Sequence, residues 1–130
     1  MNRVFILTNH QTDSGQILDL QRNWLVETVV RLPAELKNLW GSVPPETDSV
    51  DDYIFPVLSW LSSVYSPGDL VWVLGEWGAT ISVLNWCKEH SCRAIYSTTK
   101  RVATEVTTEN GVFLSHVFKH VRFRSYPVLK

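Results

Sequence analysis

The chain has 130 residues, a length that suits one domain with one hydrophobic core and leaves no room for two. Hydrophobic residues make up 45% of it, but no apolar run approaches the roughly 18 residues that a membrane-spanning helix needs. The formal net charge of −1 argues against a general nucleic-acid-binding protein, because such binding depends on many phosphate contacts.

The charge is unevenly distributed along the chain. Residues 1–87 carry four basic and ten acidic side chains, whereas residues 88–130 carry eight basic and three acidic ones. A locally basic half is compatible with one compact polyanionic ligand.

The N-terminal run Val4–Leu7 is too short for a signal-peptide core, and no small-residue cleavage site follows it, so we expect a cytoplasmic protein. Cys87 and Cys92 are the only cysteines, and in a reducing compartment we expect two free thiols. No residues have the spacing of zinc ligands. We therefore predict no metal site, and nothing in the sequence calls for a cofactor.

The chain begins with a predicted buried strand. Residues 3–8 are apolar with little alternation, as in strands covered on both faces of a parallel sheet. A polar turn over residues 9–13 follows, and Asp13 or Ser14 is expected to cap a short helix.

The next predicted elements are a strand and two helices. Residues 25–32 are rich in β-branched side chains, which favours a strand, and residues 34–40 predict a short helix. Residues 50–64 repeat apolar side chains at i, i+3, i+4 and i+7, the pattern of an amphipathic helix, with Ser49 as its cap. Pro56 lies inside this pattern and predicts either a kink or a later start.

The third part of the chain predicts a βαβ unit. A buried strand over residues 70–74 leads through the glycine turn 75–78 into a helix. The next strand covers residues 93–96 and ends in the polar segment 97–101. This order implies parallel pairing with a right-handed crossover.

The C-terminal part predicts a β-hairpin. Residues 102–108 and 112–118 are β-rich, and Asn110-Gly111 between them favours a tight turn. The alternating segment 119–126 is either part of this hairpin or a further strand.

Ligands of open α/β sheets bind beyond the carboxyl ends of the strands, near the point where strand order reverses. Three predicted loops end there: Asn9–His10, Gly75–Thr80 and Ser97–Arg101. Glycines allow close backbone approach, and a helix N-terminus offers free N–H groups to an anion. The candidate ligand contacts in these loops are Asn9, His10, Gly75, Glu76, Trp77, Gly78, Ala79, Thr80, Ser97, Thr98, Thr99, Lys100 and Arg101.

Each of these features also has a purely structural interpretation. The glycine turn is also what a tight connection requires, and without a following Gly-Lys-Ser/Thr it is not an ATP-binding Walker loop. Trp77 belongs either to the core or an interface or to a stacking platform for a base. Lys100-Arg101 is either a ligand contact or a solvated turn that enters the hairpin.

The combination of motifs resembles one known family. The matching segments occur in this order: Asn9-His10, Leu32-Pro33-Ala34-Glu35-Leu36, Trp40, Pro44-Pro45, Gly75-x-x-Gly78-Ala79-Thr80, Ser97-Thr98-Thr99-Lys100-Arg101 and Val117-Phe118-Lys119-His120-Val121-Arg122-Phe123-Arg124. Together they are similar to the small standalone CRISPR-associated proteins of type III systems, the Csx-type group with a CARF-like domain. The similarity covers nearly the whole chain.

The resemblance implies a fold, a ligand and an activity. The fold would be one α/β domain over residues 1–130, a CARF-like, Rossmann-type, three-layer arrangement with a mostly parallel central sheet and a C-terminal β-hairpin. The ligand would be cyclic oligoadenylate, with cyclic tetra-adenylate favoured, and the protein would cleave it as a ring nuclease. Such proteins act as two-fold homodimers, without a membrane or duplex DNA as a partner.

The chemistry of this reaction suggests roles for individual residues. A ribose 2′-hydroxyl attacks the adjacent phosphate, and the enzyme needs to hold the in-line geometry and stabilise charge, without a metal. His10 would transfer protons, while Lys100 and Arg101 would bind the phosphate. Additional charge would come from the C-terminal residues Lys119, His120, Arg122 and Arg124.

Three alternatives remain open at this point. A non-catalytic sponge or sensor would use the same loops to bind the same messenger. An effector nuclease is disfavoured because the chain has no room for a second domain and no paired-carboxylate metal motif. A structural or interaction protein would use its exposed aromatic side chains and hold no nucleotide.

Overall fold

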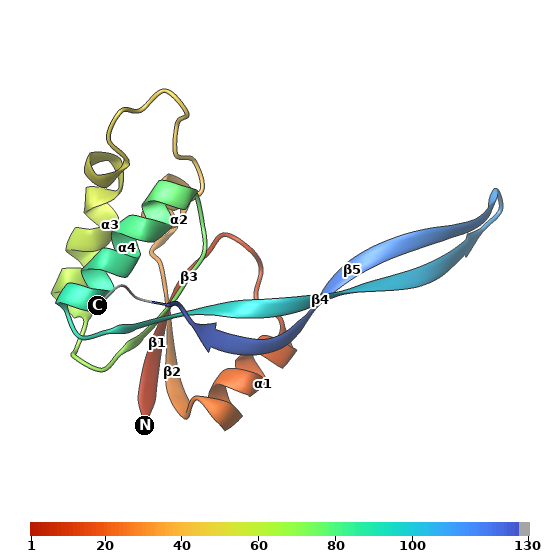
Figure 1. The fold of residues 1–130 in the computed structure, drawn as a ribbon, viewed down its shortest axis with the longest axis horizontal. Coiled ribbons are helices and arrows are strands. Elements are labelled where there is room, and N and C mark those ends of the chain that lie inside the picture. The colour runs from red at the N-terminus through yellow and green to blue at the C-terminus, as the bar shows by residue number, and fades with distance from the viewer. Residues whose placement is uncertain (128–130) are drawn as a thin grey trace.

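The computed structural model describes residues 1–127 as a mixed α/β body from which a long β-ribbon projects (Figure 1). The strands are β1 (Asn2–Leu7), β2 (Val26–Arg31), β3 (Leu70–Val73), β4 (Arg93–Thr108) and β5 (Gly111–Ser125). The helices are α1 (Ser14–Asn23), α2 (Ala34–Trp40), α3 (Val50–Val64) and α4 (Trp77–Glu89). The last three residues of the predicted domain lie outside the described range.

The five strands form one sheet in the order β2-β1-β3-β4-β5. β1 pairs in parallel with β2 and β3, and β3 pairs in parallel with β4, which confirms the mostly parallel sheet. The chain moves from β1 to β2 on one side and then returns to β3 on the other side of β1. The strand order therefore reverses between β1 and β3, where ligand sites of such sheets form.

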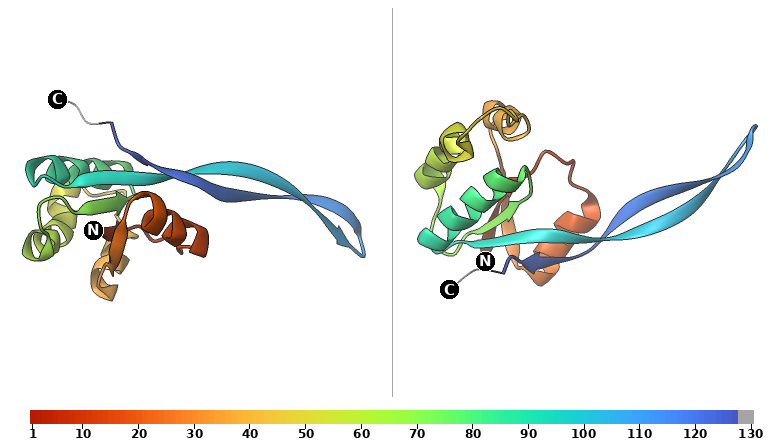
Figure 2. Two further views of the ribbon diagram at one scale, coloured as in Figure 1. Left: turned by 90° about the horizontal axis from the view of Figure 1, so that it is seen from below. Right: turned by 45° about the horizontal axis from the view of Figure 1, so that its top comes forward.

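Helices cover both faces of the sheet (Figures 1 and 2). Phe5 and Leu7 of β1 point into a core shared with α2, α3 and α4, whereas Val4 and Ile6 point toward α1. All four side chains are at most 3% exposed. The unalternating apolar run of this strand is thus explained by burial on both faces.

Most of the local sequence signals are confirmed. Asp13 caps α1 through a capping box with Gln16, and Ser49 caps α3 by accepting from the Asp52 N–H at 3.3 Å. Helix α3 begins directly after Ser49 and contains Pro56. Of the two predictions made for Pro56, the later start of the helix was therefore wrong. None of the helices within residues 1–127 is long and apolar enough to cross a membrane.

The predicted hairpin is present and longer than expected. β4 and β5 pair antiparallel from Ile95↔Ser125 to Thr108↔Gly111, and Gly111 adopts a φ of +124° at the turn. The segment 119–126 therefore belongs to this hairpin except at its end, since β5 stops at Ser125. The expected loop over residues 97–101 was wrong, because these residues continue β4 and pair with β5.

Candidate functional site

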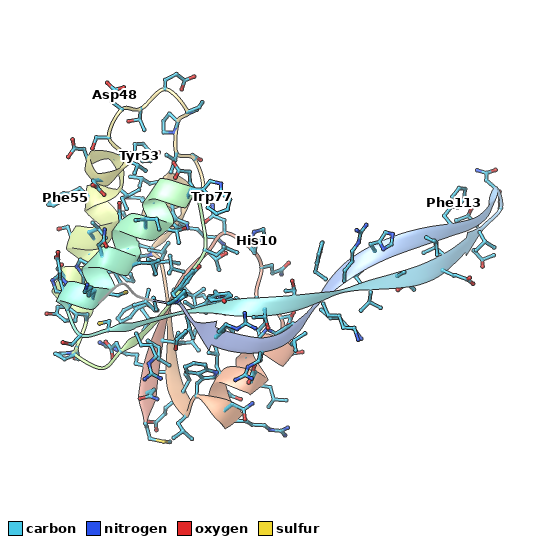
Figure 3. All side chains as sticks on the ribbon, viewed as in Figure 1. His10, Asp48, Tyr53, Phe55, Trp77 and Phe113 are labelled. Carbon is cyan, nitrogen blue, oxygen red and sulfur yellow. The ribbon has the colours of Figure 1, made fainter. Side chains whose placement is uncertain are left out.

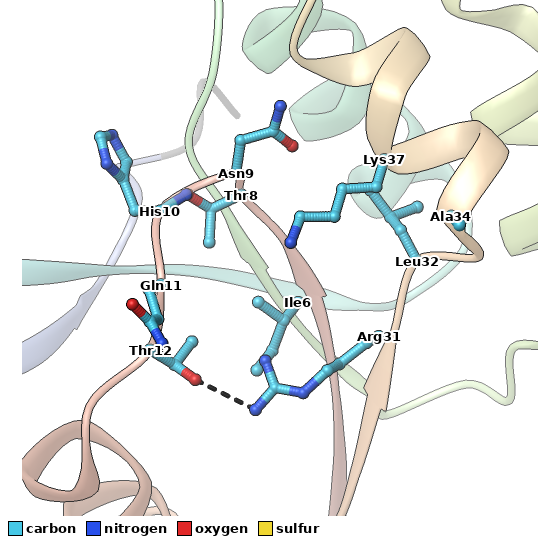
Figure 4. A pocket seen from close by; sticks show the side chains of 10 residues that line it. All are labelled: Ile6, Thr8, Asn9, His10, Gln11, Thr12, Arg31, Leu32, Ala34 and Lys37. Carbon is cyan, nitrogen blue, oxygen red and sulfur yellow. Dashed lines mark hydrogen bonds between the residues drawn. The ribbon is translucent and has the colours of Figure 1, made fainter.

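A groove of about 770 Å³ opens at the carboxyl ends of β1 and β2 (Figure 4). The loop after β1 forms one wall, and the end of β2 with the first turns of α2 forms the other. Its lining residues are Ile6, Thr8, Asn9, His10, Gln11, Thr12, Arg31, Leu32, Ala34 and Lys37. The groove lies beside the point where strand order reverses.

Two cations face this groove from adjacent elements. Arg31 is the last residue of β2, and its guanidinium donates to Thr12 Oγ1 at 3.0 Å. Lys37 lies on α2 and extends its amino group into the hollow above Arg31 (Figure 4). No carboxylate lines the groove, and neither cation forms a salt bridge within residues 1–127. The groove is therefore electropositive and suited to an anion.

Asn9 fixes the loop after β1 against α2. With its amide oriented to satisfy both neighbours, Asn9 donates to the Lys37 carbonyl oxygen at 3.1 Å and accepts from the Gly41 N–H at 3.2 Å. A Cβ on Gly41 would lie 1.5 Å from a terminal atom of the Asn9 amide, so the glycine makes room for this side chain. The amide is thus used to hold the groove's shape, whereas the sequence pattern assigned it to the ligand.

His10 lies at the rim between two hollows. The first is the groove, and the second is a cavity of about 240 Å³ bordered by Trp40, Gly75 and Glu76. The His10 side chain is exposed and points away from Arg31 and Lys37 (Figure 4). Its ring can therefore reach a ligand that extends over the loop.

The glycine turn after β3 packs against a tryptophan. The buried Trp40 donates from its Nε1 to the Leu74 carbonyl oxygen at 3.2 Å, and a Cβ on Gly75 would lie 2.7 Å from three of its ring atoms. Gly75 is thus required for this close approach. Packing against Trp40 is therefore sufficient to explain why a glycine occupies position 75, without any contact to a ligand.

The N-terminus of α4 is capped from within the chain. The Glu76 carboxylate accepts from the Gly78 N–H and, at 3.2 Å, from the Ala79 N–H. These are the N–H groups that the sequence pattern offered to a phosphate. A carboxylate at this position repels an anion, so the N-terminus of α4 suits an anion less well than the groove lined by Arg31 and Lys37.

The other residues at the start of α4 that were predicted to contact the ligand do not lie together. Ala79 and Thr80 are buried, and Thr80 Oγ1 accepts from the Gly75 N–H at 3.1 Å, which holds the turn. Trp77 is 91% exposed and, with Gly78, borders a separate shallow hollow between α3 and α4. This exposure excludes a core role for Trp77 within the single chain.

Lys100 and Arg101 are consecutive residues of β4, both exposed. Neighbouring side chains of a strand point to opposite faces, so these two cannot act together on one phosphate. Lys100 pairs across the ribbon with Lys119. Neither Lys100 nor Lys119 lines the groove. Lys100 and Arg101 lie away from the groove because β4 continues through them, where a loop was expected.

Three residues from distant parts of the chain form a hydrogen-bonded row at the base of the ribbon. His120 Nδ1 lies 2.5 Å from Ser97 Oγ, and His120 Nε2 lies 2.6 Å from Asp19 Oδ2 on α1. The His120 side chain is 7% exposed. Ser97 and His120, predicted as ligand contacts, are thus engaged with each other and with α1.

The environment of Asp19 lowers its pKa. Burial by itself raises this pKa, but hydrogen bonds from Asn23, His120 and the Phe123 backbone, together with the charge of His120, outweigh burial. Asp19 is therefore held as a carboxylate in the folded protein.

The other predicted ribbon contacts are also occupied or exposed. Thr98 Oγ1 donates to the Arg122 carbonyl oxygen at 2.8 Å, and Arg124 donates to the Tyr96 hydroxyl at 3.3 Å. Thr99 is exposed opposite His120 in the β4–β5 register. These residues extend from the sheet edge onto the ribbon and do not converge on the groove.

Sequence reasoning missed Arg31 and Lys37. It counted the loops after three strands at the ligand edge and left out the connection from β2 to α2. The signal was present, since one cation lies near the end of the predicted second strand and another follows within the next helix.

Comparison with known proteins places the chain in a family. A family model described as "Uncharacterized protein MJ1673 family" matches residues 2–124. The chain belongs to this MJ1673 family. It is 36% identical over 126 residues to "Uncharacterized protein MJ1673" of Methanocaldococcus jannaschii, covering 97% of this chain and 98% of the relative. No solved structure matches.

Proposed function

We propose that this MJ1673-family protein binds a cyclic oligoadenylate through its phosphates in the groove between β1 and α2. The observation that carries the proposal is the pair Arg31 and Lys37, which face one hollow without a carboxylate in its lining. Charge-assisted hydrogen bonds to phosphate are among the stronger polar contacts in proteins. The reversal of strand order beside the groove is compatible with the finer CARF-like, Rossmann-type description.

The proposed activity is metal-independent cleavage of the ring, as in a CRISPR type III ring nuclease. The ribose 2′-hydroxyl attacks its neighbouring phosphorus and displaces the 5′-oxygen, which leaves a 2′,3′-cyclic phosphate and a 5′-hydroxyl. Arg31 and Lys37 stabilise the additional negative charge on the phosphorane, and His10 exchanges protons once its exposed side chain turns from the rim toward the groove. Thr8 and Thr12 add hydroxyls to the same lining.

The test is incubation of the purified protein with radiolabelled cyclic tetra-adenylate in EDTA, followed by chromatography over a time course. Conversion to linear products supports a ring nuclease. An intact ring that stays with the protein supports the alternative, a non-catalytic sponge or sensor. If cyclic tri-, tetra- and hexa-adenylate are neither bound nor cut, the proposal is wrong and an interaction protein becomes the better description.

Variants connect the result to the groove. Arg31→Ala and Lys37→Ala should each weaken ring binding about tenfold or more in a calorimetric titration, since each removes a charge-assisted contact. Arg22→Ala is the matched control, because Arg22 is an exposed cation in the last turn of α1 and does not line the groove. Lys100→Ala tests the ribbon separately, and we expect an unchanged affinity because Lys100 does not line the groove.

A further inference from the structure

Beyond His120, which contacts Asp19 on α1, the ribbon has no partner within residues 1–127. We call residues 99–120 the arm. Every residue from 103 to 119 is exposed, and Phe113 lies near the far end, well away from the helices (Figure 3). The arm starts at an irregularity in the register between Thr98 and Thr99, where Val121 is left unpaired. Such a bulge bends and twists a strand, and here it marks the exit from the sheet.

The arm exposes large apolar side chains that a lone hairpin does not bury. Their exposed fractions are Val106 43%, Val112 60%, Phe113 53%, Leu114 66%, Val117 45% and Phe118 70%. An isolated two-stranded hairpin is at best marginally stable in water, and contiguous exposed apolar surface marks an interaction site. The arm thus needs a second surface to cover it.

The two faces of the arm differ. Cross-strand partners share a face, so the register assigns one face to Arg101, Ala103, Glu105, Thr107, Val112, Leu114, His116 and Phe118. We call this the Phe118 face. Its three large apolar side chains are 60–70% exposed, whereas those of the opposite face are 43–53% exposed. The Phe118 face is therefore the one that most requires cover.

The charges of the arm indicate what covers it. Residues 102–118 contain no Lys or Arg, and their acidic residues are Glu105 and Glu109. The cations lie at the base of the ribbon, at Lys100, Arg101, Lys119 and Arg122. A nucleic acid would find no Lys or Arg along the outer part. The α3–β3–α4 side of the body offers no complement to the glutamates, because residues 38–87 contain six acidic residues and no Lys or Arg, and the cations Arg31 and Lys37 face the groove.

A second arm in antiparallel orientation complements this pattern. We propose that two copies of the chain form a two-fold dimer in which the arms pack through their Phe118 faces. An axis at Ala103 and His116 brings Arg101 opposite Glu105 of the partner subunit, and the reverse by symmetry. The same axis brings Phe118 opposite the partner's Leu114. The same axis places Ala103 opposite the partner's Ala103, and His116 opposite the partner's His116.

The arm-mediated dimer does not depend on the proposed ligand, and its test measures the mass of the protein in solution. Sedimentation or light scattering over a concentration series should show a dimer of the full chain. Leu114→Glu and Phe118→Glu should each raise the dissociation constant about tenfold or more, as for central apolar contacts of an interface. Phe55→Glu is the matched control, since Phe55 on α3 is 64% exposed and far from the arm, and it should leave the dimer intact (Figure 3).

Charge reversal tests the register. Arg101→Glu and Glu105→Arg should each weaken the dimer, and the double variant should restore it, because the reciprocal pairs form again with reversed sign. Circular dichroism should show the same fold for all variants. A monomeric wild-type protein at tens of micromolar, a dimer insensitive to Leu114→Glu, or no restoration in the double variant would overturn the proposal. So would a wild-type monomer that instead shifts on labelled RNA or DNA.

Discussion

His120 on β5 contacts Asp19 on α1, with 2.6 Å between Nε2 and Oδ2. The two residues are 101 positions apart in the chain, and the contact connects the base of the ribbon to the first helix. Ser97 Oγ lies 2.5 Å from the other nitrogen of the same ring. Both ring nitrogens are thereby satisfied in a site that is almost closed to solvent.

We expect His120→Ala to destabilise the fold by about 1–3 kcal/mol, because it leaves a partly buried carboxylate with fewer hydrogen bonds. Urea unfolding followed by circular dichroism measures this loss. His116→Ala is the control, since His116 is exposed on the arm. Equal stability of the two variants would show that the His120–Asp19 contact contributes nothing.

The lowered pKa of Asp19 predicts an acid-dependent contribution to stability. A carboxyl whose folded pKa lies below its unfolded value stabilises the fold above the unfolded value of about 3.9, and this contribution is lost as the pH falls through the folded pKa. The stability difference between wild type and Asp19→Asn should therefore shrink as the pH falls below about 4. A difference that stays constant from neutral pH into strong acid would contradict the assignment.

Gly75→Ala should destabilise the protein by about 1–3 kcal/mol, because the added methyl group would overpack the indole of Trp40. Thermal unfolding checks this. Gly15→Ala is the control, since its Cβ would lie 3.3 Å from a side-chain oxygen of Asp13 and meet nothing of the core. A second variant, Gly75→Ala with Trp40→Phe, should recover part of the loss. An undiminished melting temperature for Gly75→Ala would mean that the turn relaxes freely.

The two cysteines should react slowly with thiol reagents in the native protein. Burial and, to a smaller extent, the charge of Cys92 raise the pKa of Cys87 to about 12. Burial and, to a smaller extent, the charge of Asp69 raise the pKa of Cys92 to about 11. Labelling at about pH 8 should therefore be fast only in denaturant. Fast labelling of both thiols without denaturant would contradict this.

The same shifts have a consequence at high pH. A thiol whose folded pKa is raised contributes stability that is fully present below its ordinary pKa of about 8.5 and is lost as the pH rises toward the folded value. Replacing Cys87 with Ala should make the stability less dependent on pH between about 9 and 11.

Local signals in the chain predict most of the secondary structure. The unalternating run of β1, the caps at Asp13 and Ser49, and the Asn110-Gly111 turn depend only on neighbouring residues, so the sequence is sufficient to find them. The end of β4 is different. Ser97 to Arg101 resemble a polar loop, and only their pairing with β5 keeps them extended.

Periodicity and turn chemistry are local properties, and for that reason the α/β class, the buried parallel strands and the hairpin follow from the order of the residues. Which side chains meet is a property of the folded chain. Folding brings Arg31 and Lys37 to one groove, turns Lys100 and Arg101 to opposite faces, and closes His120 against Asp19. Such contacts depend on strand order and register, which long-range packing determines and which no local sequence pattern predicts.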